Sequence, residues 1–282
     1  MKKLLLATDL SPRSELALQR AMSLAREHGA ALSVVHVVDE DLPPSLAEVT
    51  KSGAERIIRE RLGALPDGPK VEVAVTILSG RASNEILGHA ADDKAELIVL
   101  GLHRKGGLKE MFRGTTAERV IRTGNIPVLV VKSEAKKPYR RVVVGTDFSV
   151  HARRAMQLAL RLAPKAELYL VHAFLVPFQG FMYGAGTRRQ VETEHREGMT
   201  AMVGEEMQTF LAGFKGAPPE VHQICREGMA QEAILKEVVG NQADLLVLGT
   251  HGRTGVAHAV LGSVAEDLLT EAPCDVLVAR AW

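Results

Sequence analysis

The chain has 282 residues, a length that allows either two domains or one large domain. Hydrophobic residues make up 46% and charged residues 24%, which excludes a disordered, collagen-like or small disulfide-rich protein. A formal net charge of +1 and an aromatic content of 4% argue against binding to nucleic acid or a membrane surface, so local groups must hold any polyanion.

Apolar segments are too short for export or membrane insertion. No apolar stretch approaches the ~18 residues of a membrane span, and the run at residues 4–7 is shorter than a signal peptide requires. Cys225 and Cys274 match no metal or redox spacing, which favours reduced core residues. We therefore expect a cytoplasmic protein.

The sequence repeats itself once. Residues 7–11 (ATDLS) recur as residues 145–149 (GTDFS), and residues 95–103 (AELIVLGLH) recur as residues 243–251 (ADLLVLGTH). The offset is 136 residues between His36 and His172 but 148 between Gly101 and Gly249, so the second copy holds about a dozen extra residues. Two copies so far apart indicate two domains rather than a solenoid.

Each copy alternates short apolar runs with helical stripes, the pattern of βαβ units on a parallel sheet. Ser11 before Pro12, and Ser149 in the second copy, are helix N-caps, and Gly29 marks a helix end. The expected fold is α/β, with two tandem doubly wound, five-stranded, mainly parallel sheets. The expected strands are residues 4–7, 32–38, 71–78, 97–101, 127–131, 142–145, 167–174, 221–225, 245–249 and 276–279.

A short charged segment ending in a proline, residues 132–138, predicts an inter-domain linker. The expected domains are therefore residues 1–134 and 138–282. So short a linker would let the two sheets pack side by side as a covalent pseudo-dimer.

Ligands of open parallel sheets bind at the carboxyl ends of the strands, where the repeated motifs fall. In residues 249–263 (GTHGRTGVAHAVLGS), glycines after a strand could expose backbone amides to an anion at the start of a helix. Ser263 could donate its hydroxyl and Arg253 a charge to a phosphate chain. Alternatively, the glycines serve only a tight connection from strand to helix.

The spacing is neither that of a P-loop nor G-x-G-x-x-G. G-x-x-G, nine residues, then G-S resembles the nucleotide-binding signature of the ATP-binding branch of the universal stress protein family. The Thr-Asp-x-Ser turn, the Val-His step and the Val-Leu-Val final strand extend this resemblance over both copies. It implies ATP as ligand, or AMP or ADP, with or without Mg²⁺.

The resemblance implies that Asp147 and Ala173 contact the adenosine part and that the loop glycines and Ser263 hold the phosphates. A carboxylate such as that of Asp147 can accept hydrogen bonds from ribose or the adenine amine; the alternative is a capping or turn role. The complete set of candidate ligand-binding residues is Thr146, Asp147, Ala173, Leu248, Gly249, His251, Gly252, Arg253, Gly262, Ser263 and Val264.

The first copy departs from this pattern, because Arg104 stands where the second glycine should be. Either this copy is empty and structural, or it holds AMP or another small anion. Our hypothesis is one ATP site per chain, in the second copy. The residues of the second candidate site are Asp9, Val37, Gly101, Arg104, Gly114 and Thr115.

The remaining features have plainer expectations. His36 and His172 are expected to be hydrogen-bonded core residues, whereas His103 and His251 lie in the loops; no metal site is expected. The aromatic insertion at residues 174–186 is a flap over the nucleotide, a docking surface for a partner or a cover for the domain seam. Residues 188–210 read as a helix with a solvated face.

The motif supplies phosphate donors but no general base aimed at a water molecule. The resemblance implies a nucleotide-dependent stress-response regulator or sensor, and the lack of a base leads us to expect at most slow ATP hydrolysis. The alternatives are an ATP-dependent adenylating or phosphotransfer enzyme on the same scaffold, and a ligand-free interaction scaffold. A homodimer is also open, and the protein effector is not specified by the sequence.

Overall fold

The structure is a computed structural model that describes residues 1–65, 71–102, 114–135, 137–176, 185–214, 221–250 and 261–280, with the backbone alone for residues 185–192. The two copies of the repeat are called the N-terminal and C-terminal halves. The N-terminal half contains β1 (Lys3–Ala7), α1 (Pro12–His28), β2 (Ala31–Val38), α2 (Pro44–Ala64), β3 (Val73–Ser79), α3 (Ala82–Asp92), β4 (Leu97–Gly101), α4 (Thr116–Thr123) and β5 (Val128–Val131). The C-terminal half contains β6 (Arg141–Gly145), α5 (Val150–Leu162), β7 (Glu167–Phe174), α6 (Ala185–Ala212), β8 (Val221–Glu227), α7 (Ala230–Gly240), β9 (Leu245–Gly249), α8 (Ser263–Glu271) and β10 (Asp275–Ala279).

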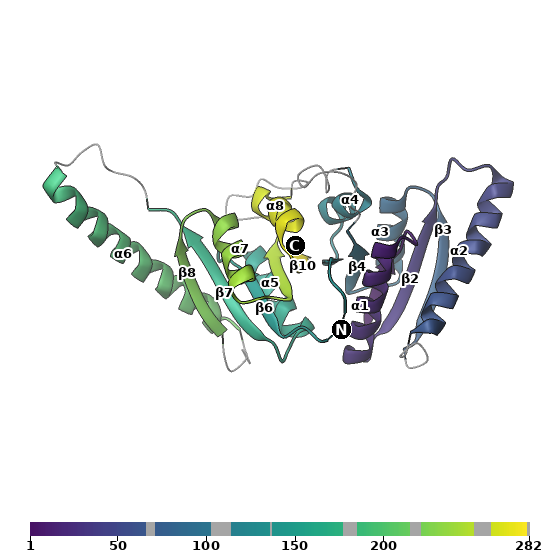
Figure 1. Cartoon of the computed structure of the whole chain (residues 1–282), viewed down its shortest axis with the longest axis horizontal. Coiled ribbons are helices and arrows are strands. Elements are labelled where there is room, and N and C mark those ends of the chain that lie inside the picture. Colours follow the sequence, from purple (N-terminus) through teal and green to yellow (C-terminus); the bar gives the residue numbers. More distant parts are fainter. Residues whose placement is uncertain are drawn as a thin grey trace.

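All ten expected strands are present, and the α/β class with two doubly wound halves is confirmed. The two halves do more than pack side by side, however. They share one ten-stranded sheet of order β3-β2-β1-β4-β5-β10-β9-β6-β7-β8 (Figure 1). Within each half the strands pair in parallel, and β5 pairs antiparallel with β10 at the junction.

Two helical layers cover the sheet, because side chains alternate between its faces. Leu4 and Leu6 belong to the core beneath α1, α2, α5 and α6, whereas Leu5 and Ala7 belong to the core beneath α3, α4, α7 and α8. Equivalent helices of the two halves thus share a face. The antiparallel junction therefore relates the halves by a pseudo-twofold axis perpendicular to the sheet. As a result, the strands of the two halves run in opposite directions, and their carboxyl ends lie at opposite ends of the strand direction.

The predicted helix signals are confirmed. Ser11 caps α1 by accepting a hydrogen bond from the Ser14 amide, and Ser149 caps α5 by accepting from the Ala152 amide. Gly29 ends α1 with φ of 59°, a left-handed conformation that glycine adopts without a steric penalty.

The predicted linker is bound tightly to the body of the protein around Asp275, the first residue of β10. The Asp275 carboxylate is fully buried and accepts hydrogen bonds from Arg20, the Ser133 hydroxyl and the Tyr139 hydroxyl. It also accepts from the backbone amides of Lys132 and Ser133. The Arg20 guanidinium lies 4.2 Å from the centre of the Tyr139 ring, a cation–π distance. One buried carboxylate therefore joins α1, the linker and β10.

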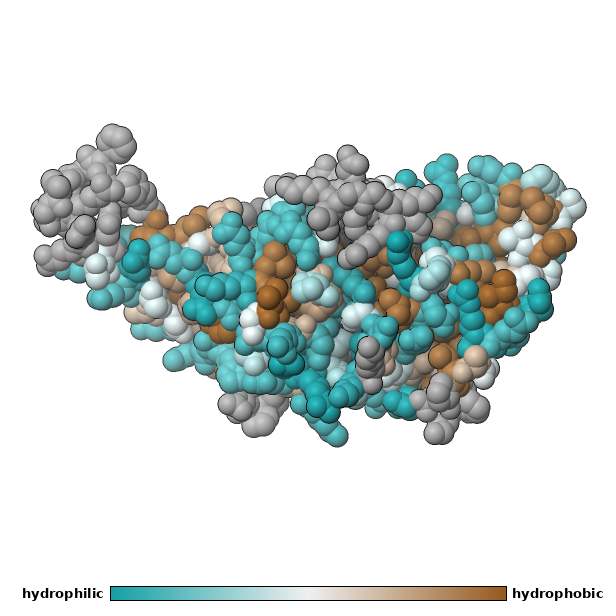
Figure 2. All heavy atoms as spheres, viewed as in Figure 1, coloured by the Kyte–Doolittle hydropathy of each residue, from teal (hydrophilic) through white to brown (hydrophobic). Residues whose placement is uncertain are grey.

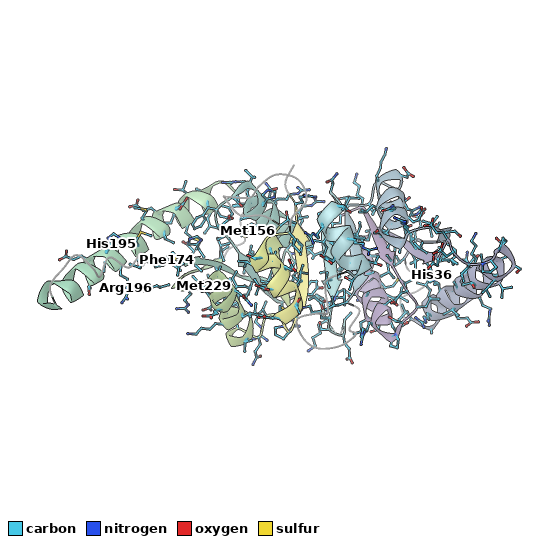
Figure 3. All side chains as sticks on the ribbon, turned by 90° about the horizontal axis from the view of Figure 1, so that it is seen from above. His36, Met156, Phe174, His195, Arg196 and Met229 are labelled. Carbon is cyan, nitrogen blue, oxygen red and sulfur yellow. The ribbon has the colours of Figure 1, made fainter. Side chains whose placement is uncertain are left out.

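The long helix α6 confirms the helix expected at residues 188–210. Met207 and Phe210 bury one part of it against the sheet, while residues 193–198 are exposed and the amino-terminal part extends past the sheet edge (Figure 1). Arg196, labelled in Figure 3, forms an ion pair with Glu227 of the edge strand β8.

The visible face of the molecule is mostly hydrophilic with small apolar patches (Figure 2). None of the helices in the described part of the chain is long and apolar enough to cross a membrane. Both cysteines are free; Cys274 is buried as expected, but Cys225 lies on edge strand β8 and is only partly buried.

Candidate functional site

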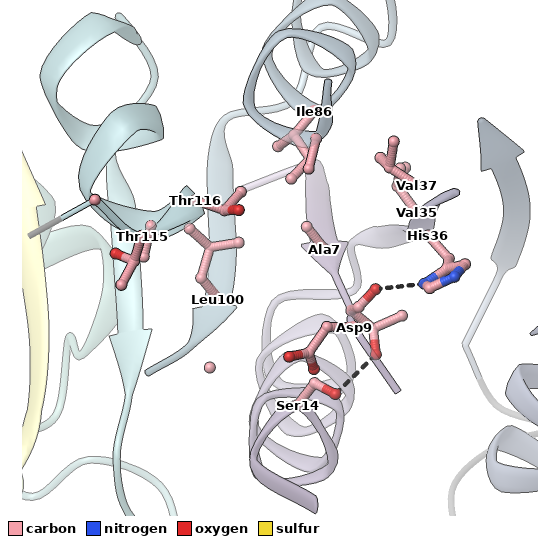
Figure 4. A pocket seen from close by; sticks show the side chains of 15 residues that line it. Ala7, Asp9, Ser14, Val35, His36, Val37, Ile86, Leu100, Thr115 and Thr116 are labelled. Carbon is pink, nitrogen blue, oxygen red and sulfur yellow. Dashed lines mark hydrogen bonds between the residues drawn. The ribbon is translucent and has the colours of Figure 1, made fainter. Parts of the chain in front are cut away.

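The N-terminal half contains a cavity of about 350 Å³ at the carboxyl ends of its strands (Figure 4). The ends of β1, β2 and β4 form its floor, and the first residues of α3 and α4 close its sides. Five of the six residues of the second candidate site line it together: Asp9, Val37, Gly101, Gly114 and Thr115. The sixth, Arg104, lies outside the described residues.

A tight turn after β1 presents Asp9 at this cavity. The Asp9 carboxylate accepts a hydrogen bond from the Ser11 amide at 3.0 Å, and the Thr8 hydroxyl accepts one from the Leu10 amide at 3.1 Å. Leu10 has φ of 62°, a left-handed conformation that is unusual for leucine. Hydrogen bonds donated by backbone amides to neighbouring side chains thus hold a strained turn at the mouth of the cavity, a common feature of functional sites.

The C-terminal half builds the same turn after β6. The Asp147 carboxylate accepts from the Ser149 amide at 3.1 Å, and the Thr146 hydroxyl accepts from the Phe148 amide at 3.0 Å. Phe148 has φ of 64°. The alternative turn role that the sequence left open for the aspartate is therefore real in both halves. It uses one carboxylate oxygen of each residue.

Histidines on β2 and β7 brace the two turns. His36 Nδ1 lies 2.8 Å from the Thr8 carbonyl oxygen, and His172 Nδ1 lies 2.7 Å from the Thr146 carbonyl oxygen. Because a carbonyl oxygen only accepts hydrogen bonds, Nδ1 carries the proton in each case. Both histidines are hydrogen-bonded as expected, although they are half-buried rather than fully enclosed.

Gly101 and Gly249 have a packing role at the ends of β4 and β9. A Cβ atom at Gly101 would lie 2.8 Å from the Arg13 carbonyl oxygen in the first turn of α1. A Cβ atom at Gly249 would lie 2.9 Å from the Cβ atom of His151 in the first turn of α5. The close approach of strand and helix therefore accounts for the first glycine of each motif. This packing against α1 and α5 differs from the tight connection to the following helix that the sequence offered as an alternative.

The two halves differ where the glycine loop meets the following helix. In the N-terminal half, Thr115 caps α4 by accepting from the Glu118 amide, and the Glu118 carboxylate accepts in turn from the Gly114 amide. The arrangement is similar to a capping box, except that the glutamate bonds to the amide of the residue before the cap.

In the C-terminal half, Gly262 is the N-cap, and its amide donates to the Thr250 carbonyl at 2.8 Å. That bond joins the start of α8 to the residue that follows β9. Ser263 is the first helical residue and is exposed, and Val264 packs partly against the core.

Other residues of the main candidate site occupy the places equivalent to the N-terminal cavity. Thr146 and Asp147 directly follow β6, and Ala173 lies near the end of β7. The Leu248 side chain, near the end of β9, lies against Gly145. His251, Gly252 and Arg253 lie outside the described residues, as do His103, His258 and most of the aromatic insertion. Within the described ranges, no group of three or more His, Cys, Asp or Glu side chains could hold a metal ion.

His151 is a site residue that the sequence reasoning missed. Partial burial lowers its pKa, Asp147 opposes the shift by favouring the charged form, and Arg280 adds to the lowering. It stands in the first turn of α5 against Gly249, at the edge of the candidate site. Its place two residues after the Ser149 cap, in the first turn of the helix, is the sequence signal that could have identified it.

The fold and the paired turns define a class: a tandem, doubly wound α/β protein with a candidate ligand site at the carboxyl ends of the strands in each half. The model of the universal stress protein family matches residues 1–132 and 138–280. The chain therefore belongs to the universal stress protein family.

Relatives confirm the tandem arrangement. A universal stress protein of Mycolicibacterium smegmatis is 25% identical over 98% of this chain and 96% of its own length. One from Methanocaldococcus jannaschii is 32% identical over 48% of this chain and 85% of its own length. The crystal structure of a universal stress protein from Archaeoglobus fulgidus matches with a TM-score of 0.72 and 22% identity, covering 99% of this chain and 98% of that one.

A universal stress protein has also been solved in complex with cAMP. It covers 52% of this chain and is itself covered completely, with 24% identity and a TM-score of 0.37.

Proposed function

We propose that this protein binds adenine nucleotides at the carboxyl ends of its strands, with ATP in the C-terminal half, and that it acts as a nucleotide-dependent regulator of a cytoplasmic stress response. The observation that carries the proposal is the N-terminal cavity of about 350 Å³, which is lined by five candidate residues that the sequence resemblance had implied. That volume lies within the range of small-molecule sites. Its pseudo-symmetric counterpart carries the complete glycine motif.

In both sites the nucleoside part is assigned to the aspartate at the strand end and the phosphate part to the start of a helix. The carboxylates of Asp9 and Asp147 lie at the strand ends. A carboxylate there can accept hydrogen bonds from the hydroxyl and amine groups of a nucleoside. The amino-terminal ends of α4 and α8 lie near the carboxyl ends of the strands in their halves. Each carries the positive end of a helix dipole, which favours phosphate. Family membership supports this assignment, since another member has been solved with cAMP, an adenine nucleotide.

We assign ATP to the C-terminal half because Gly252 leaves the backbone accessible to a phosphate, whereas the N-terminal half has Arg104. The N-terminal cavity then accommodates a nucleoside or AMP. A near-neutral chain must hold a triphosphate by local groups, and Arg253 supplies one positive charge beside the motif.

A sensor fits the described groups better than an enzyme. The turn aspartates serve nucleotide binding, and Mg²⁺ would bind as part of the ATP complex. Because β5 and β10 pair with each other, a homodimer would have to form through another surface.

The test is to measure nucleotide content after gentle purification and then to titrate the apoprotein with ATP, AMP and adenosine by calorimetry. Asp147→Asn and Gly252→Arg should each weaken ATP binding at least tenfold, because one removes a carboxylate and the other copies the Arg104 side chain into the intact loop. Asp9→Asn should leave the ATP affinity unchanged and weaken AMP or adenosine binding.

The control is Asp39→Asn, which changes an exposed aspartate beyond the end of β2. If Asp9→Asn alone abolishes ATP binding, then ATP binds in the N-terminal half, which contradicts the assignment of ATP to the C-terminal half. Absence of adenine-nucleotide binding at millimolar concentrations would refute the proposal, and steady turnover of ATP with a second substrate would favour the enzymatic alternative.

A further inference from the structure

Each half of the sheet sends one cation across the junction to the end of a helix in the other half. Lys132 follows β5, and its ammonium group donates to the Ala272 carbonyl at the end of α8, with an Nζ–O distance of 2.8 Å. Arg280 follows β10, and its Nη1 donates to the carbonyls of Arg122 and Gly124 at the end of α4, at 3.1 and 3.2 Å.

These two contacts are equivalent under the pseudo-twofold symmetry. Lys132 and Arg280 are separated by the same 148 residues as Gly101 and Gly249. Each is the residue directly after the last strand of its half. These contacts cannot be predicted from the sequence, because a lysine or an arginine after an apolar strand is usually an ordinary surface charge.

The carbonyls that receive these cations need a partner. The last carbonyl oxygens of a helix receive no hydrogen bond from an amide of the same helix. Because Gly124 and Ala272 are buried, water does not supply that bond either. A positive charge at a helix carboxyl end also interacts favourably with the helix dipole. Each cation therefore satisfies a buried carbonyl and stabilises the last turn of a helix from the opposite half.

The capped helices are those at the candidate sites. The first residues of α4, Thr116 and Ala117, line the N-terminal cavity, and α8 begins at Ser263 of the glycine motif. With 8 and 9 residues, α4 and α8 are too short to be stable without tertiary contacts. Order at one end of such a helix depends on order at the other.

We propose that Lys132 and Arg280 are positioning residues that act across the junction: Lys132 holds α8 for the C-terminal site, and Arg280 holds α4 for the N-terminal site. Each nucleotide site is then completed by the half that does not contain it. This inference rests on the proposed function for its effect on binding, but its effect on the helices does not require a ligand.

The first experiment measures amide hydrogen exchange of the full-length, ligand-free chain. Lys132→Met keeps a long apolar side chain and removes the charge and the donor, and it should accelerate exchange several-fold in the last turn of α8 but not in α4. Arg280→Met should do the reverse. Lys132→Arg should restore protection, and Lys165→Met, at an exposed lysine in the α5–β7 turn, is the control for loss of a positive charge.

The second experiment measures nucleotide affinity with only one site active. In an Asp9→Asn background, Lys132→Met should weaken ATP binding roughly 2- to 10-fold, since a site that is ordered for a smaller fraction of the time binds more weakly. Lys165→Met should leave ATP binding unchanged, and Lys132→Arg should restore it.

The outcomes separate this inference from the proposed function. If the parent protein binds no adenine nucleotide, the proposed function fails, while the exchange experiment still decides whether the cations hold the helices. Unchanged exchange in both methionine variants would overturn the inference. So would faster exchange in α8 with unaltered ATP affinity, because Lys132 would then stabilise the helix without positioning the site.

Discussion

Replacing Asp275 by asparagine tests whether the buried network at the junction makes the two halves one cooperative unit. Oδ1 of Asp275 accepts from the amides of Lys132 and Ser133 and from the Ser133 hydroxyl, at 2.9, 3.0 and 2.9 Å. Oδ2 accepts from Arg20 Nε at 3.1 Å and from the Tyr139 hydroxyl at 2.7 Å. An asparagine of the same shape can satisfy the first group with its oxygen but must turn its NH₂ toward Arg20.

The expected cost follows from burial. Arg20 is 3% exposed and Asp275 is 0% exposed, so the variant leaves a guanidinium buried with no carboxylate. Breaking such a pair costs about 3–5 kcal/mol. At about 2–4 °C per kcal/mol for a protein of this size, the unfolding midpoint should fall by roughly 6–20 °C. Tyr139→Phe should cost only about 1 kcal/mol, because it removes one hydrogen bond and no charge.

The assay is urea unfolding monitored by circular dichroism and by the fluorescence of Trp282, in a double-mutant cycle with Arg20→Met. The double variant should be more stable than the sum of the single effects by about 1–3 kcal/mol, since removing both charges removes the uncompensated one. Arg56→Met, at an exposed pair with Glu60, is the control and should cost less than about 1 kcal/mol. A loss below 1 kcal/mol for Asp275→Asn, or strictly additive effects, would refute the assigned role.

Three further outcomes follow from the structure. Thr115→Ala should cost about 1 kcal/mol of unfolding free energy by removing a helix cap, whereas Ser263→Ala should cost less because Gly262 is the cap there; equal losses in urea titrations would contradict this. Burial raises the pKa of the Cys274 thiol to about 12, so iodoacetamide at pH 8 should leave it unmodified until the protein unfolds, while Cys225, whose pKa burial also raises, should react slowly in the folded state; mass spectrometry distinguishes the two. Because burial lowers the pKa of His151 in the folded state below its ordinary value of 6.5, the unfolded chain binds more protons and the histidine lowers stability as the pH falls below 6.5; His151→Gln should reduce the slope of unfolding free energy between pH 7.5 and 5.5, and an unchanged slope would count against the shift.

Local features of the chain were readable because each depends on a few neighbouring residues. Apolar runs predicted all ten strands, and a serine before a helical stripe predicted the caps at Ser11 and Ser149. The internal repeat then implied a doubly wound fold for both halves and placed the candidate residues at the strand ends. Five of the residues chosen for the N-terminal half do meet at one cavity, because parallel strands bring their carboxyl ends to a common edge.

The first residues of α4 and α8 show the limit of prediction from local sequence. Thr115 and Ser263 occupy equivalent places, and each is followed three residues later by a glutamate, which is the residue pattern of a capping box. Thr115 is the cap of α4, whereas at Ser263 the preceding glycine is the cap and bonds to Thr250. The same residue pattern at the start of a helix therefore does not by itself determine which residue is the cap.

Contacts between distant segments required the folded chain. Arg20 and Asp275 are 255 residues apart, and Lys132 and Ala272 are 140 apart. Nothing in the periodicity of either segment marks a partner at that range, because a charged side chain on an amphipathic helix usually faces water. The sequence thus determined the two similar halves and their strands, and it predicted candidate residues for each site. The antiparallel pairing of β5 with β10 joined those halves into one sheet, and that junction alone brought each cation to the helix of the opposite half.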